Sequence, residues 1–313
     1  MNEWALAGDL GELADLPLAL GPYEIVRWLA QGGMATLFEA WDAPRGRSVA
    51  LKVARRGEAV RGQEPPGLGM EAAALSALDH PRIVRLLDRD AGGDPAWLAL
   101  EYLPGLNLAE RILEAGGRLS PAEVEPHLAD LAAALVHAHG RGIVHGDVKP
   151  SNLVVDEGGR VSLVDFGLAS AVGAGVGVDL AALRGGAARS SSWGTPAFMA
   201  PELYRGAPRS PATDAWAAGA VAFVALTGER PYTLYQLWTG ALGEGVSGRL
   251  PPGVSGALRG GLEALLCADE GRRLRGLSAL GSQPAGGMAL DPHRRSGGSS
   301  TGQNGASWIT PRP

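Results

Sequence analysis

The chain has 313 residues, 45% of them hydrophobic, which is enough for a substantial buried core in one large domain or two ordinary ones. A formal net charge of -5 argues against nucleic acid as the main partner, because neutralising phosphates requires clustered excess Lys and Arg. Cys267 is the only cysteine, which excludes an intrachain disulfide and a multi-cysteine zinc site.

The beginning of the chain lacks the cationic start of a secretory signal, since residues 1–20 contain four acidic residues and no Lys or Arg. The longest apolar run, at residues 215–227, is shorter than the ~18–20 residues that a membrane-spanning helix needs. We therefore expect a cytoplasmic protein without a membrane span. The pattern of residues 1–20 leaves open whether this lead-in is a loose amphipathic helix or unstructured.

The next part of the chain is rich in short β-type runs separated by Gly and Pro, which predicts an antiparallel sheet. Residues 55–69 are rich in Gly, Pro and charge and predict a loop, whereas the Ala-rich residues 70–78 predict a helix. The strands are expected at residues 23–26, 36–40, 48–53, 83–87 and 96–100.

Helices are expected to dominate after Pro104, which we interpret as part of a hinge between two domains or lobes. Ser120 starts a pattern of N-cap residue, first-turn proline and acid at the third position, so a helix should run from there to about His139. Residues 281–313 are rich in Gly, Ser and Pro and cannot bury enough surface to offset their ordering entropy. We predict that they form a disordered tail.

Two features of the predicted sheet could bind phosphates. A turn between two strands keeps only the middle glycine of a G-x-G-x-x-G loop, at Gly32, with Ala30 and Ala35 at the outer positions. Alone, this turn is better explained as an ordinary hairpin. Lys52 would place its ammonium group under the turn, and Glu71 on the following helix could orient Lys52 through an ion pair. The spaced pair favours phosphate binding.

The most specific pattern is the run at residues 145–152, which is followed by an Asp-Phe-Gly triplet that starts at Asp165. Asp147 can accept a proton from a substrate hydroxyl, and Lys149 can neutralise a transferring phosphoryl group. Asn152 and Asp165 offer oxygen ligands for Mg²⁺ or Mn²⁺. The pattern predicts phosphoryl transfer from ATP.

These motifs resemble those of the protein kinase superfamily, most closely the eukaryotic-like Ser/Thr protein kinases of bacteria, over roughly residues 23–280. The resemblance implies an α+β, bilobal fold, with a small antiparallel-sheet lobe that has one main helix and a larger, mostly helical lobe. The implied domain spans residues 21–280, divided into lobes at 21–103 and 104–280. It also implies an ATP-dependent protein Ser/Thr kinase whose substrates are proteins with Ser or Thr, this chain itself included.

The resemblance assigns residues of a nucleotide site as well. The backbone of residues 101–103 would bind adenine beside a gatekeeper at Leu100, and Asn107 would lie near the ribose. Lys52, Asp147 and Lys149 are implied as catalytic residues, and Asn152 and Asp165 as metal ligands. The full set implied to contact the nucleotide is Ala30, Gly32, Gly33, Ala35, Leu37, Ala50, Lys52, Glu71, Leu100, Glu101, Leu103, Asn107 and Leu153.

Later motifs agree with the resemblance in order and spacing. Residues 194–202 resemble the substrate-docking loop and the end of the activation segment. Asp214 resembles the start of the buried helix that braces the catalytic loop. Arg273 falls where the family places a buried arginine that pairs with a glutamate, here Glu202, so we expect this ion pair.

Gly146 raises an alternative, because His-Gly-Asp also begins the catalytic loop of aminoglycoside and choline phosphotransferases. Those enzymes typically lack a lysine at the position of Lys149 and the motif at residues 194–202. A pseudokinase scaffold is a second alternative, based on the two alanines in the glycine-rich turn. Gly146 also replaces the arginine that, in many family members, grips an activation-segment phosphate. We therefore expect a non-RD catalytic loop, and hypothesise that residues 168–193 need no phosphorylation to become active.

Overall fold

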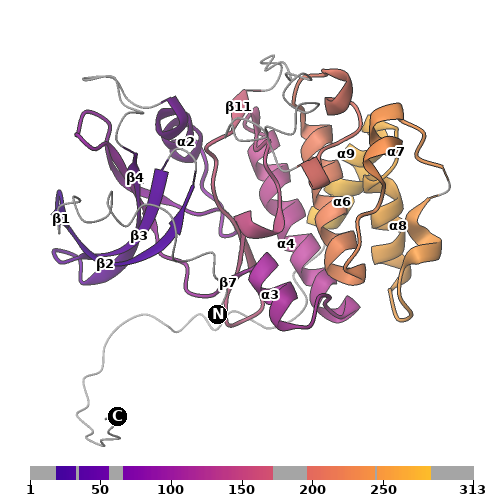
Figure 1. Ribbon diagram of the computed structural model, residues 1–313, viewed down its shortest axis with the longest axis horizontal. Helices are drawn as coiled ribbons and strands as arrows, with labels where there is room; N and C mark the ends of the chain where they lie inside the picture. The colour runs from indigo at the N-terminus through magenta and orange to yellow at the C-terminus, as the bar shows by residue number, and fades with distance from the viewer. Residues whose placement is uncertain (1–18, 33–34, 56–65, 172–195, 244, 283–313) are drawn as a thin grey trace, which may run out of the picture.

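The computed structural model describes residues 19–32, 35–55, 66–171, 196–243 and 245–282, which form two lobes (Figure 1). One lobe is built on an antiparallel sheet and the other is mostly helical, so the predicted α+β, bilobal architecture is confirmed. The six-stranded sheet has the order β1-β2-β3-β4-β6-β5. Its strands are β1 (Ala19–Leu20), β2 (Tyr23–Gln31), β3 (Ala35–Asp42), β4 (Arg47–Ala54), β5 (Leu86–Asp90) and β6 (Trp97–Glu101).

Strand β1 corrects one predicted boundary. The sequence places Ala19 and Leu20 in the lead-in, but they pair with Glu24 and Tyr23 of β2. Leu20 and Tyr23 are buried, and the ring of Tyr23 packs edge-on against Trp97 with centroids 5.3 Å apart. The sheet therefore begins before residue 21 because these apolar side chains complete its small core.

The helix of the sheet lobe, α2 (Pro66–Ser76), also departs from prediction. It begins within the segment predicted as a loop and ends before residue 78. Proline is tolerated in the first turn of a helix, where its missing N–H has no intrahelical partner. Leu68, Ala72 and Leu75 are buried, so tertiary packing rather than local composition determines where this helix starts.

The strand predicted at residues 83–87 is displaced to β5. Ile83 instead forms an isolated parallel bridge with Leu163 of the helical lobe. The N–H of Val84 donates to the Leu163 carbonyl at 3.1 Å, and the N–H of Leu163 donates to the Arg82 carbonyl at 2.9 Å. The apolar pattern at Ile83 and Val84 therefore marks a backbone connection between the lobes.

Helices α4 (Pro121–His139) and α6 (Pro211–Thr227) form the centre of the helical lobe. The predicted start of α4 is confirmed by its capping box, in which Glu123 accepts a hydrogen bond from the Ser120 N–H at 3.1 Å. Almost every residue of α6 is buried, and a Cβ at Gly219 would lie 2.7 Å from the Leu265 Cβ. Around them lie α3 (Leu108–Glu114), α7 (Leu234–Thr239), α8 (Gly256–Leu265) and α9 (Glu270–Gly281).

Helix α9 supplies the buried arginine that the sequence predicted. Arg273 Nη1 lies 2.5 Å from Glu202 Oε1, and Nη2 donates to Glu202 Oε2 at 3.1 Å, so the expected ion pair is confirmed. Helix α9 ends one residue beyond the predicted domain end, and the predicted tail lies outside the described residues from residue 283 onward. Within the described part of the chain, we find no helix with the length and apolar character needed to cross a membrane.

Short strands near the junction of the lobes position two loops. Strand β9 (Leu153–Val155) pairs with β10 (Val161–Leu163) on one side and with β7 (Leu106–Asn107) on the other. Strand β8 (Ile143–Val144) pairs with β11 (Ser170–Ala171). The loop at residues 145–152 therefore runs from β8 to β9, and the segment that contains Asp165 runs from β10 to β11.

Candidate active site

Lys52 lies between two carboxylates that come from different lobes. It projects from β4, and its Nζ lies 2.5 Å from Glu71 Oε2 of α2 and 2.8 Å from Asp165 Oδ1 of the segment after β10. The structure thus brings together three of the predicted residues. One ammonium group fixes the position of the α2 helix relative to the Asp165 segment.

The electrostatics of this cluster favour its charged form. Burial lowers the pKa of Lys52, but Glu71 and Asp165 outweigh this effect and the pKa is raised. Burial would raise the pKa of Asp165, yet the neighbouring Lys52 ammonium lowers it to about 2. Burial also raises the pKa of Glu71, which Lys52 opposes. Lys52 and Asp165 are therefore charged at neutral pH, the state needed to bind phosphates and a cation.

Asp165 adopts a backbone conformation that few L-residues use. Its φ is 64°, and it is the one non-glycine residue with positive φ in the described part of the chain. The following ring of Phe166 packs edge-on against His145, with centroids 4.7 Å apart. A Cβ at Gly167 would lie 3.2 Å from Asp165 Oδ1, so glycine keeps that oxygen accessible. Strain held in place by packing is typical of functional sites.

The backbone of the loop at residues 145–152 is held by Asp214 at the start of α6. Asp214 Oδ2 accepts from the His145 N–H at 2.8 Å, and Oδ1 accepts from the Gly146 N–H at 2.9 Å. His139 Nε2 lies 2.9 Å from Asp214 Oδ2 and adds a third polar contact. Burial would raise the pKa of Asp214, but the contacts with His139 lower it. The buried carboxylate therefore stays charged and anchors the loop backbone.

Within the loop, three predicted residues contact one another. Lys149 Nζ donates to Asp147 Oδ2 at 2.6 Å. The Asn152 amide nitrogen donates to the Asp147 carbonyl oxygen at 3.0 Å and to Asp147 Oδ2 at 3.3 Å. Two donors thus converge on one carboxylate oxygen, which fixes the rotation of the Asp147 side chain.

Backbone contacts of Val164 connect this loop to the Lys52 cluster. The Val164 N–H donates to the Asn152 carbonyl at 3.0 Å, and His145 Nε2 lies 3.1 Å from the Val164 carbonyl. His145 is fully buried and also accepts from the Asp147 N–H through Nδ1 at 3.2 Å. His145 is therefore a structural bridge, and it keeps Asp165, the next residue after Val164, beside the loop.

The predicted adenine-site residues lie on neighbouring strands. Leu37 is opposite Lys52, and Ala50 is opposite Leu100, which is buried. The N–H of Glu101 already donates to the Arg85 carbonyl at 2.9 Å, so a bound base would have to use other backbone groups between Glu101 and Leu103. The strands thus position this part of the predicted pocket.

The remaining predicted nucleotide residues have different environments. The Gly32 N–H donates to the Ala35 carbonyl at 2.8 Å, which closes the turn between Ala30 and Ala35. Gly33 lies outside the described residues, as do residues 172–195 of the predicted activation segment. Asn107 Oδ1 caps helix α3 by accepting from two backbone N–H groups, which leaves its amide nitrogen as the polar group that could contact a ribose.

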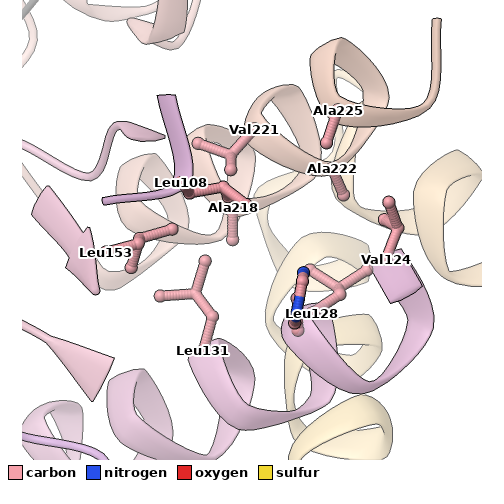
Figure 2. A pocket seen from close by; sticks show the side chains of 10 residues that line it. Leu108, Val124, Leu128, Leu131, Leu153, Ala218, Val221, Ala222 and Ala225 are labelled. Carbon is pink, nitrogen blue, oxygen red and sulfur yellow. The ribbon is translucent and has the colours of Figure 1, made fainter. Parts of the chain in front are cut away.

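Leu153 lies at one side of a small apolar cavity in the helical lobe (Figure 2). The cavity has a volume of about 10 Å³, roughly one water molecule, and its walls come from α3, α4 and α6. Alanines of α6 form much of one wall, which explains why the space is not filled. The lining residues are Leu108, Val124, His127, Leu128, Leu131, Leu153, Ala218, Val221, Ala222 and Ala225.

Comparisons with known proteins agree with this geometry. The protein kinase domain family matches residues 23–240, which is more than half of the chain. The chain belongs to the protein kinase family. Its relatives include the serine/threonine-protein kinase PrkC of Bacillus subtilis (strain 168), which is 34% identical over 212 residues, covering 68% of this chain and 31% of PrkC.

Other kinase relatives come from bacteria and plants. The probable serine/threonine-protein kinase pknA2 of Bifidobacterium longum is 34% identical over 215 residues, covering 68% of this chain and 27% of the relative. The CBL-interacting serine/threonine-protein kinase 24 of Arabidopsis thaliana is 31% identical over 215 residues, with 68% and 46% covered. This kinase chain therefore spans less than half of the length of these relatives.

Sequence reasoning missed residues whose contacts are distant in the chain. Asp130 of α4 accepts from Arg160 Nε at 2.8 Å and from the Val161 N–H at 3.0 Å, which ties β10 to α4. Arg209, which precedes α6, lies against Gly146 of the loop at residues 145–152 and donates to the Leu168 carbonyl at 3.2 Å. Neither residue falls in a short motif. The available signal was a charged side chain within or beside a mostly apolar segment. Such a side chain predicts a partner but does not show which residue the partner is.

Proposed function

We propose that this chain is a protein Ser/Thr kinase that transfers the γ-phosphoryl group of ATP to Ser or Thr hydroxyls of proteins. The observation that carries the proposal is the connection between two polar groups of residues. The ion-paired Lys52 and Asp165 lie beside the loop that presents Asp147, and His145 and Val164 join them. Phosphoryl transfer depends on this combination of positioning and charge stabilisation.

The side chains of the loop suit the reacting groups. Asp147 would orient the incoming hydroxyl and accept its proton, since its carboxylate is held by Lys149 and Asn152. Lys149, 2.6 Å from Asp147 Oδ2, would neutralise charge on the transferring phosphoryl group as that charge develops. Lys52 would hold the phosphates of ATP from the opposite lobe.

Asn152 and Asp165 fit a divalent cation. The described residues contain no group of three or more His, Cys, Asp and Glu side chains that could hold a metal on its own. One carboxylate and one carboxamide oxygen suit Mg²⁺ or Mn²⁺ when nucleotide phosphates complete the coordination. The Asn152 nitrogen is bound to Asp147, which leaves its oxygen as the metal donor. When bound, the cation would neutralise charge on the β- and γ-phosphates.

The form of the loop separates this proposal from its alternatives. Lys149 follows the proposed base by two positions and contacts it, a feature that small-molecule phosphotransferases of the related type typically lack. Every charged residue that transfer requires is present and in contact with another member of the site, which argues against a scaffold without activity. Proteins with Ser or Thr are therefore the substrates that we propose.

The experiment is to measure transfer of labelled phosphate from ATP to a generic acceptor protein, together with ATP binding by calorimetry. Asp147→Asn should lower transfer by about a hundredfold or more and leave the affinity for ATP nearly unchanged, because Asp147 acts on the acceptor hydroxyl. Asp79→Asn, which makes the same change at an exposed position, is the matched control. ATP binding without transfer in the unmodified protein would instead indicate a scaffold, and transfer to aminoglycosides or choline alone would indicate a small-molecule kinase.

A further inference from the structure

Arg209 fills the space beside Gly146 where a side chain of residue 146 would begin. A Cβ on Gly146 would lie 2.8 Å from Cδ of Arg209 and 3.2 Å from its Nε. Gly146 also has a φ of 77°, a conformation that favours glycine. The side chain of Arg209 therefore packs directly on the backbone of the loop that carries Asp147.

The same arginine binds the segment that follows Asp165. Arg209 Nη1 donates to the Leu168 carbonyl at 3.2 Å. The Leu168 oxygen would itself lie 3.1 Å from a Cβ on Gly146, so residues 146, 168 and 209 meet at one point. Directly beyond Leu168, β11 pairs with β8. Arg209 thus adds a side-chain contact where the predicted activation segment leaves the site.

Nearby carboxylates favour the charged form of Arg209 at this position. Burial lowers the pKa of the half-buried Arg209, whereas the carboxylates of Asp147 and Asp214 act in the opposite direction. Arg209 directly precedes Ser210, the N-cap residue of α6, and Asp214 lies in the first turn of that helix. The start of α6 therefore holds the loop with two side chains, a carboxylate that binds its N–H groups and a guanidinium that packs against Gly146.

Packing alone does not fix the loop at this point. A cavity of about 20 Å³ lies against Gly146, Asp147 and Val148, with Met199, Leu203 and Ala217 among its other lining residues. Side chains next to unfilled space are constrained less by van der Waals contacts. The polar contacts from Asp214 and Arg209 add restraint at this point.

We propose that Arg209 is a positioning residue for phosphoryl transfer, which holds Asp147 and the Leu168 segment in their working arrangement in place of an arginine at position 146. The proposal rests on the function proposed above. A carbonyl oxygen is a permanent feature of the backbone, so the contact with Leu168 requires no phosphorylation. The chain thereby supplies from the start of α6 a guanidinium that its catalytic loop lacks.

The test compares Arg209→Gln and Arg209→Lys with the unmodified protein by steady-state kinetics and amide hydrogen exchange. Arg209→Gln should lower kcat by about tenfold to a hundredfold and leave KM for ATP within about twofold, because it misplaces Asp147 without touching the nucleotide. Arg209→Lys keeps the charge and should recover part of kcat. Amides of residues 146–148 and 168–170 should exchange faster in Arg209→Gln. Arg205→Ala removes an exposed arginine from the same connecting segment and is the control.

Each result has a defined meaning. Unchanged exchange in Arg209→Gln would overturn the proposal, and so would faster exchange with an unchanged kcat. Equal losses of kcat in the Gln and Lys variants, with faster exchange of the same amides in both, would support a requirement for the guanidinium itself and not only for its charge. If the unmodified protein transfers no phosphate, the proposed kinase function fails, and hydrogen exchange alone decides whether Arg209 positions the loop.

Discussion

Arg273→Ala tests the buried ion pair of the helical lobe. In the structure the guanidinium makes two contacts with Glu202, at 2.5 and 3.1 Å, and its Nε donates to the Cys267 carbonyl at 2.7 Å. It also lies over the Trp216 ring at 4.9 Å. Removing the arginine would leave the Glu202 charge in a site that is 8% exposed and would leave a void beside Trp216.

The expected loss follows from these contacts. Breaking a buried pair from one side costs about 3–5 kcal/mol, because the remaining charge is desolvated without a partner. For a domain of this size, each kcal/mol lowers the melting temperature by about 2–4 °C, so the expected decrease is about 6–20 °C. Loss of the Trp216 contact acts in the same direction.

Thermal melting followed by circular dichroism, with urea unfolding as a second measure, would test this value. Arg272→Ala, the exposed neighbour on α9, should melt within about 2 °C of the unmodified protein because surface changes rarely exceed 0.5 kcal/mol. The double variant Arg273→Leu with Glu202→Leu should recover much of the loss, since no charge stays unpaired. A normal melting temperature for Arg273→Ala would refute the reasoning.

Three further predictions concern the site and the core. Lys52→Met should weaken ATP binding as well as transfer, because Lys52 would contact the phosphates, and calorimetry that shows unchanged affinity would contradict this. Phosphatase treatment should leave turnover nearly unchanged, since Gly146 has no side chain that could bind a phosphate. Loss of most activity would exclude the hypothesis that residues 168–193 need no phosphorylation. Burial lowers the pKa of His127 in the folded state, so its protonation favours the unfolded chain. The stability that neutral His127 contributes is complete above about pH 6.5, the unfolded-state pKa, and is lost as the pH falls through the lower folded-state pKa. His127→Phe should therefore reduce the fall in urea midpoint between pH 7 and pH 5, and an unchanged pH slope would contradict the assignment.

The sequence predicted those features whose signal is local. The capping pattern at Ser120 located the start of α4 because caps act over three residues. The run from residue 145 to 152 predicted a site because its polar residues lie close in sequence and contact one another in the structure. The Glu202–Arg273 pair was predicted through the family resemblance rather than through any local pattern.

The features that sequence reasoning missed depend on distant partners. The apolar residues at Ile83 and Val84 resemble a strand of the sheet, but their hydrogen-bond partner is Leu163, eighty residues later. The Gly- and Pro-rich start of α2 resembles a loop because helix propensity reflects local composition only. It does not include the tertiary packing that buries Leu68. Arg209 acquires its position only when α6 packs beside the loop at residues 145–152.

The parallel bridge at Ile83 has a mechanical consequence. The backbone hydrogen bonds that Leu163 makes with Val84 and Arg82 join the lobes two residues before Asp165. A movement of one lobe relative to the other that keeps these hydrogen bonds would be a rotation about this point. Asp165 and its partner Lys52 lie close to this point, so their ion pair can stay assembled while more distant parts of the lobes move.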